Sequence, residues 1–104
     1  MYSKVFELSN LLSELDGQAG YFIDFISTRG IQAGIIRLHP GENDCQEPHS
    51  VDEVYYVIED NGFIKLDGKD HRIREGTSIF VPAKADHSFH GNKQDLVIFY
   101  ALGG

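Results

Sequence analysis

Short runs of apolar and β-branched residues, separated by turn-forming residues, dominate the chain. The strongest run lies at 51–58, where residues 54–58 read VYYVI and place apolar side chains on both faces of a strand. Such a strand is expected to be covered on both sides. The pattern predicts about eight or nine short strands, and its clearest ranges are 21–27, 31–39, 51–58, 64–66, 69–73, 78–81, 87–90 and 96–102.

Turn signals between these runs predict antiparallel hairpins. Asp67-Gly68 separates two of the runs and suits a tight type I′ turn, and Thr28-Arg29-Gly30 separates the first two. Pro40-Gly41 ends the second run, and the polar segment GENDCQE at 41–47 reads as a loop. Because closing strands into a barrel or jelly roll removes exposed sheet edges, we expect an all-β antiparallel barrel.

One segment near the N-terminus departs from the strand pattern and predicts a helix of two turns over 10–16. Leucines at 11, 12 and 15 lie close to helical spacing. Ser9 is a suitable N-cap, and Gly17 can supply a left-handed residue at the C-terminal end. The fold class is therefore all-β with one short N-terminal helix.

Length and composition agree with this fold class and limit the number of domains, the disulfides and the expected location. The chain of 104 residues, 41% of them hydrophobic, fits a single globular domain over 1–104. Its single cysteine, Cys45, excludes an internal disulfide, so the fold needs no oxidising compartment. The sequence shows neither a signal peptide nor an apolar run of about 18 residues, so we expect a cytoplasmic protein with no membrane contact.

The charge balance argues against two classes of partner. The chain has 16 acidic and 9 basic residues, a net charge of -7, and no cluster of Lys or Arg. Nucleic acids and anionic membranes select the opposite balance. No segment resembles a helix-turn-helix. We therefore expect neither nucleic acid nor membrane as a partner.

A set of histidines and carboxylates predicts a metal site. Side chains at even separations on a strand share a face, so Glu47, His49 and Glu53 would point the same way on an unbroken strand. His87, on a different strand, can add a second imidazole. Two imidazoles and a carboxylate form the donor set of mononuclear Fe(II) sites, and also of Mn, Co, Ni and Zn sites. One divalent transition metal is the predicted cofactor.

The segment 41–62 resembles the first sequence motif of the cupin family. In that motif a glycine is followed after five residues by His-x-His, then by Glu and a closing glycine. Here Gly41 precedes five residues, then Glu47-Pro48-His49, three further residues and Glu53.

The segment 76–92 resembles the second cupin motif. Gly76 is followed by five residues and Pro82, then by His87, and Asn92 lies near the family's closing asparagine. The chain therefore resembles a small single-domain cupin of the cupin 2 type.

The resemblance implies a double-stranded β-helix barrel of the jelly-roll type with a metal near its centre. It assigns His49 to the second histidine position, Glu53 to the carboxylate position and His87 to the final histidine position. The chain departs from the family pattern at three residues. Glu47 replaces the first histidine, while Asp60 and Lys84 replace glycines.

A homodimer is the expected assembly. Cupins are often dimeric, and this chain carries 5 Tyr and 7 Phe together with strands that are apolar on both faces. Such a chain has more apolar surface than one small core covers.

The identity of a fourth ligand stays open between two neighbouring residues. Strand parity selects Glu47, whereas a bulge at Pro48 would turn Gln46 inward instead. Other polar or aromatic candidates have simpler interpretations. Tyr55 is interpreted as a core residue, Cys45 as an inert loop thiol and Arg37 as an outward charge. His71 and His90 are interpreted as surface residues or as residues that contact the metal ligands from behind.

Three functional readings follow from these residues. Three protein ligands leave coordination positions open, as in a catalytic site, and this favours oxygenase or isomerase chemistry on a small molecule. The alternative is a non-catalytic barrel that binds or senses a small ligand, with or without metal. A third reading is a structural barrel whose cavity is filled by side chains. The substrate and the reaction are not predicted.

Overall fold

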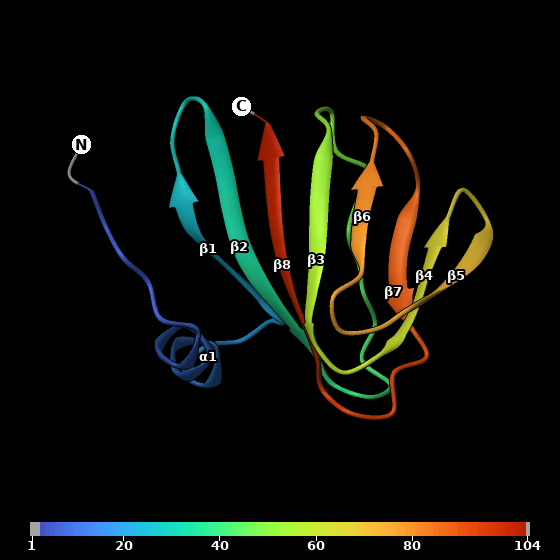
Figure 1. Cartoon of the computed structure of the whole chain (residues 1–104), viewed down its shortest axis with the longest axis horizontal. Coiled ribbons are helices and arrows are strands. Elements are labelled where there is room, and N and C mark those ends of the chain that lie inside the picture. Colours follow the sequence, from blue (N-terminus) through green and yellow to red (C-terminus); the bar gives the residue numbers. More distant parts are fainter. Residues whose placement is uncertain (1–2, 104) are drawn as a thin grey trace.

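Two antiparallel β-sheets and one short helix make up the fold, as the computed structural model of residues 3–103 shows. The larger sheet has the strand order β1-β2-β8-β3-β6, and the smaller has the order β5-β4-β7. The elements are α1 (Leu8–Asp16), β1 (Phe22–Ser27), β2 (Ile31–Leu38), β3 (Glu53–Glu59), β4 (Gly62–Leu66), β5 (Lys69–Ile73), β6 (Ser78–Val81), β7 (His87–His90) and β8 (Leu96–Gly103). Figure 1 shows α1 beside the β1–β2 end of the larger sheet and β4 and β5 at the opposite end. The all-β prediction is confirmed.

Each of the eight clearest predicted runs corresponds to a strand. The hairpin turn at Asp67-Gly68 is also confirmed, because φ is 48° and 85° at these two residues and a type I′ turn requires positive φ at both. The start of β3 differs from the prediction, and this difference affects where the candidate metal ligands lie. The run predicted to start at residue 51 enters the sheet only at Glu53, and residues 43–52 form an irregular loop. Pro48, which has no backbone N–H to donate, lies in this loop.

The helix is longer than predicted. The predicted N-cap is wrong, whereas the C-cap lies at Gly17 as predicted but in another backbone conformation. It begins at Leu8, with Glu7 at the N-cap, so Ser9 lies inside the first turn. The earlier start brings Leu8 into the apolar cluster between the helix and the sheet. Gly17 has φ −88° and is not left-handed; its N–H donates to the carbonyl of Glu14 and ends the helix in a tight turn.

The apolar core lies between the two sheets. Tyr55 and Val57 of β3 point inward and are fully buried, as are Leu38, Leu96 and Ile98. Burying each of these aliphatic side chains stabilises the fold by about 1.5–3 kcal/mol. A second, smaller cluster seals α1 against the outer face of the larger sheet, through Leu11, Leu15, Ile35 and Val97.

The outer face of β3 and β6 leaves three large apolar side chains in solvent. Val54, Tyr56 and Phe80 are 47%, 45% and 60% exposed, and Val54 lies opposite Phe80 in the β3–β6 ladder. We call these three residues the β3–β6 patch. Among residues 3–103, no helix has the length and hydropathy needed to cross a membrane.

The homodimer stays a prediction, and the β3–β6 patch is where we expect the second copy to bind. Sedimentation at tens of micromolar should show a dimer for the natural chain. Phe80→Glu should shift it toward monomer, because a charge would be buried in the interface. Ile31→Glu, at a similarly exposed apolar residue outside the patch, should leave the dimer intact. A monomeric natural chain would contradict the prediction.

Candidate metal centre

The structure brings His49, Glu53 and His87 together at one point. One ligand atom from each lies within 4.8 Å of the other two. Oε1 of Glu53 is 3.5 Å from Nε2 of His49 and 3.5 Å from Nε2 of His87. These distances are too long for good hydrogen bonds. They match the spacing of about 3.0–3.5 Å expected between two donors bonded to one ion at about 2.0–2.2 Å.

Backbone bonds between the two motif segments hold the group in place. Glu53 is the first residue of β3 and is fixed in register on both sides, opposite Val81 of β6 and Leu102 of β8. The carbonyl of His49 accepts the N–H of Lys84 at 2.7 Å, which ties the irregular loop to the turn before His87. The loop and the turn therefore position both imidazoles together.

The two residues that replace family glycines both adopt the backbone conformation that glycine favours. φ is 69° at Asp60 and 70° at Lys84. A side chain in this left-handed region costs about 1–2 kcal/mol. At Lys84 the conformation is stabilised by the backbone bond to His49.

The tautomer of His87 leaves a free lone pair at the site. Its Nδ1 lies 3.1 Å from the carbonyl oxygen of Ala85 and donates its proton there. In the neutral imidazole, Nε2 is then the nitrogen without a proton, and it faces Glu53. A backbone carbonyl on the outer ring nitrogen is the usual way to orient a metal-binding imidazole.

Three atoms that could ligate a metal at this point have no hydrogen-bond partner within the described part of the chain. They are Nε2 of His49, Oε1 of Glu53 and Nε2 of His87, and all three are buried. Leaving a buried polar atom unpaired costs about 1–3 kcal/mol. A divalent cation would satisfy all three atoms at once, so the residues present fit the predicted metal.

Burial also sets the electrostatics of the site. Removal from water raises the pKa of Glu53 above its ordinary value, and the neighbouring His49 and His87 only partly oppose this effect. Burial likewise raises the pKa of Tyr55, which stays a neutral phenol. A bound cation would reverse the balance at Glu53 by stabilising its carboxylate.

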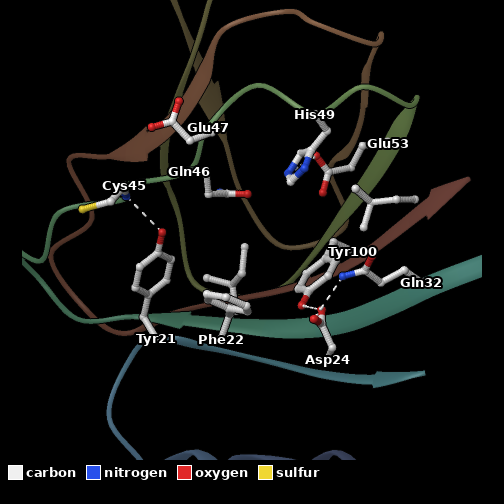
Figure 2. A pocket seen from close by; sticks show the side chains of 12 residues that line it. Tyr21, Phe22, Asp24, Gln32, Cys45, Gln46, Glu47, His49, Glu53 and Tyr100 are labelled. Carbon is white, nitrogen blue, oxygen red and sulfur yellow. Dashed lines mark hydrogen bonds and ion pairs between the residues drawn. The ribbon is translucent and has the colours of Figure 1, made fainter. Parts of the chain in front are cut away.

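Glu47 is not brought into this group. Its side chain is exposed, and Figure 2 shows its carboxylate directed away from His49 and Glu53. The parity argument was wrong because residues 47–52 are not strand. Gln46 points inward, as the bulge alternative predicted. Ligation by Glu47 or by Gln46 stays a prediction.

A hydrogen-bond chain that sequence reasoning missed holds Gln46 in place. The hydroxyl of Tyr55 donates to Oε1 of Gln46 at 2.9 Å, and Nε2 of Gln46 donates to Asp44 at 3.0 Å. Asp44 also accepts the Phe89 N–H at 2.7 Å and the Tyr21 hydroxyl at 2.8 Å. Asp44 thus anchors the irregular loop to β7 and to the start of β1.

A cavity of about 350 Å³ opens onto His49 and Glu53. Figure 2 shows it from close by. Its walls come from β1, β2, β8, the irregular loop and the start of β3, and the lining residues are Tyr21, Phe22, Asp24, Gln32, Ile36, Cys45, Gln46, Glu47, His49, Glu53, Tyr100 and Leu102. Cys45 is exposed, and Tyr55 is a core residue as predicted.

The wall formed by β1, β2 and β8 carries a second polar group. The hydroxyl of Tyr100 donates to Oδ1 of Asp24, and Nε2 of Gln32 donates to Oδ2 at 3.0 Å. Gly34 makes this contact possible, because a Cβ there would lie 2.2 Å from the Tyr100 hydroxyl oxygen. Burial and the Asp24 carboxylate raise the pKa of Tyr100, so its hydroxyl remains a donor.

The other candidates lie outside the cavity. Arg37 is on the outer face, as predicted, but there it pairs with Asp16 of α1 and is largely covered. His71 is exposed, and His90 pairs with Asp70 on the smaller sheet, so both are surface residues as predicted.

Comparison with known proteins shows a family match and similar proteins over most of the chain. A family model described as "Cupin domain" matches residues 34–102. An uncharacterized protein of Streptomyces coelicolor is 32% identical over 93 residues, which cover 89% of each chain. Dimethylsulfoniopropionate lyase DddW of Ruegeria pomeroyi is 29% identical over 74 residues, 71% of this chain and 49% of the lyase, so this chain spans about half of that enzyme. The crystal structure of TT1209 from Thermus thermophilus has a TM-score of 0.78 at 17% identity, covers 97% of both chains, and shows likeness of fold.

Glu53→Gln should stabilise the metal-free protein at neutral pH. Because the folded pKa of Glu53 is raised, the unfolded chain loses this proton first as pH rises above the ordinary value of 4.5. The contribution of protonated Glu53 to the free energy of unfolding is fully present below pH 4.5. It is lost as the pH rises through the pKa that Glu53 has in the folded protein. Above the folded pKa, urea unfolding should show a lower free energy of unfolding for the natural chain than for Glu53→Gln, by about 1–3 kcal/mol, because Gln keeps the shape of the side chain without burying a charge. Glu59→Gln, at an exposed carboxylate of the same strand, should not reproduce the effect. Parallel pH curves for Glu53→Gln and the natural chain would contradict it.

The two candidate fourth ligands should behave differently on substitution. Gln46→Ala removes both an inward amide and the link between Tyr55 and Asp44, which holds the loop that carries His49. It should weaken metal binding about tenfold, the size of loss seen when a residue that positions metal ligands is removed. Glu47→Gln should change the affinity by less than about twofold, because the side chain points to solvent. Titration with Mn(II) or Co(II) measures both. A tenfold loss in Glu47→Gln alone would show that Glu47 ligates.

Proposed function

The chain belongs to the cupin domain family, and we propose that it binds one divalent transition metal through His49, Glu53 and His87 and uses it to act on a small molecule. The single observation that carries this proposal is the set of three buried donor atoms without partners, which meet at the wall of a cavity. An ordinary buried polar network would satisfy its own atoms.

Each of the three candidate ligands has a defined part in such a site. Nε2 of His87, fixed by the bond from Nδ1 to Ala85, and Nε2 of His49 supply neutral nitrogen donors. Glu53 supplies one negative charge. A bound Fe, Mn, Ni, Co or Zn ion would supply Lewis acidity or, with Fe, dioxygen chemistry. Three protein ligands leave other positions free for a molecule in the cavity, whose volume suits a small ligand.

The enzyme reading is supported by these open positions and by the relative that is a lyase. We therefore favour oxygenase-, isomerase- or lyase-type chemistry. The second candidate, a non-catalytic barrel that binds or senses a small ligand, would use the same cavity. The third, a filled structural barrel, fits poorly because the cavity is open. A cytoplasmic location stays part of the proposal.

Metal analysis of protein purified without a chelating column tests the proposal. We expect the natural chain to take up close to one equivalent of metal. His49→Ala and His87→Ala should lose it while circular dichroism stays unchanged, because the barrel fixes the ligands rather than the reverse. His71→Ala, at an exposed histidine of β5, is the matched control and should keep full occupancy. Full occupancy in both site variants, or no uptake by the natural chain from Fe, Mn, Ni, Co or Zn, would overturn the proposal.

A further inference from the structure

The cavity that opens onto the candidate metal ligands carries carboxylates and no balancing side-chain cation. Asp24 and Glu47 line it together with Glu53, and over the described residues neither Lys nor Arg contributes to its wall. The one basic side chain on β2, Arg37, lies on the outer face of the sheet and pairs with Asp16. A ligand that is only anionic would meet repulsion along most of this wall.

Asp24 is an exposed carboxylate, but hydrogen bonds to both of its oxygens hold it in a fixed orientation. Tyr100 and Gln32 each donate to one of its oxygens, and Gly34 leaves the space that the Tyr100 hydroxyl needs. Both donors are neutral, so they orient the carboxylate without cancelling its charge. In Figure 2, Asp24 and Tyr100 lie on the opposite side of the cavity from His49.

Aromatic rings line the same cavity, and two of them belong to residues beside Asp24: Tyr100 is hydrogen-bonded to its carboxylate, and Phe22 lies two residues away on the same face of β1. Tyr21, Phe22 and Tyr100 all line it, and Phe22 remains 46% exposed although it is a large apolar side chain. Aromatic faces beside a carboxylate recognise ammonium and other onium groups, through cation–π and charge–charge attraction together. The buried, unpartnered Glu53 at the other end supplies the independent indication that the cavity takes a ligand.

From these contacts we infer that the cavity binds a bipolar small molecule, with an oxygen donor group on the metal and a cationic onium group against Asp24 and the aromatic rings. The inference rests on the proposed function for its metal end. With the ion bound, that end is net positive and attracts a carboxylate or carbonyl oxygen, while the Asp24 end is net negative. The two ends together select both the class of molecule and its orientation.

The test compares matched probes on the Co(II)-loaded protein. Trimethylammonio-carboxylates with one, two or three methylene groups are each titrated beside the isostere in which carbon replaces nitrogen, which keeps the carboxylate but has an uncharged tert-butyl group at the other end. Entry of the carboxylate is followed by the visible absorption of Co(II). At least one cationic probe should bind about fivefold more tightly than its isostere, and added salt should reduce the preference.

Asp24→Asn should remove this preference while leaving Co(II) affinity and binding of the isostere unchanged, which also shows that the variant is folded. Asp70→Asn, at a carboxylate on the smaller sheet outside the cavity, is the matched control and should keep the preference. Equal or tighter binding of the isosteres, or no binding of any probe to the Co(II)-loaded protein, would overturn this inference and leave the metal site standing. Failure of the natural chain to bind Co(II) would instead overturn the proposed function and this inference with it.

Discussion

Three buried side-chain atoms that have no hydrogen-bond partner among residues 3–103 are the constraint around which the rest of the structure is arranged. His49, Glu53 and His87 each keep one atom unsatisfied at the wall of the cavity. Together these atoms cost several kcal/mol in the metal-free protein, at about 1–3 kcal/mol each. The apolar core between the sheets offsets that cost, and the ladders of β3 with β6 and β8 keep Glu53 from turning to solvent. A bound cation, as proposed above, would remove this cost by pairing all three atoms.

The irregular loop before β3 contributes both to the candidate metal centre and to the wall of the cavity. One side of the loop is bonded to the turn before His87, and the other is anchored through Asp44 to β7 and to Tyr21. The loop therefore fixes one ligand of the metal and also forms one wall of the cavity. Across from it, β1, β2 and β8 present the Asp24–Tyr100 pair. The proposed metal site and the proposed onium site therefore lie on separate elements, so substitutions can test them separately.

Much of the fold was predictable because its signals are local. Strand runs and the Asp67-Gly68 turn are encoded by neighbouring residues, and each appears where expected. The convergence of His49, Glu53 and His87 was predicted from motif spacing, but the parity argument for Glu47 failed because the chain is irregular until Glu53. The N-cap prediction failed because the contact of Leu8 with the sheet outweighs the local preference of Ser9. The Asp24–Tyr100 pair was missed because its residues are 76 positions apart and meet only through the pairing of β1, β2 and β8.

The central claim, that one ion completes the three unpaired donors, is tested most directly by X-ray absorption spectroscopy at the metal edge of the Co(II)- or Zn(II)-loaded protein. The account predicts a first shell of nitrogen and oxygen atoms at about 2.0–2.2 Å, with the outer-ring scattering of two imidazoles. His87→Ala should reduce the imidazole contribution to one. A shell with sulfur from Cys45, or one without imidazole scattering, would contradict the account.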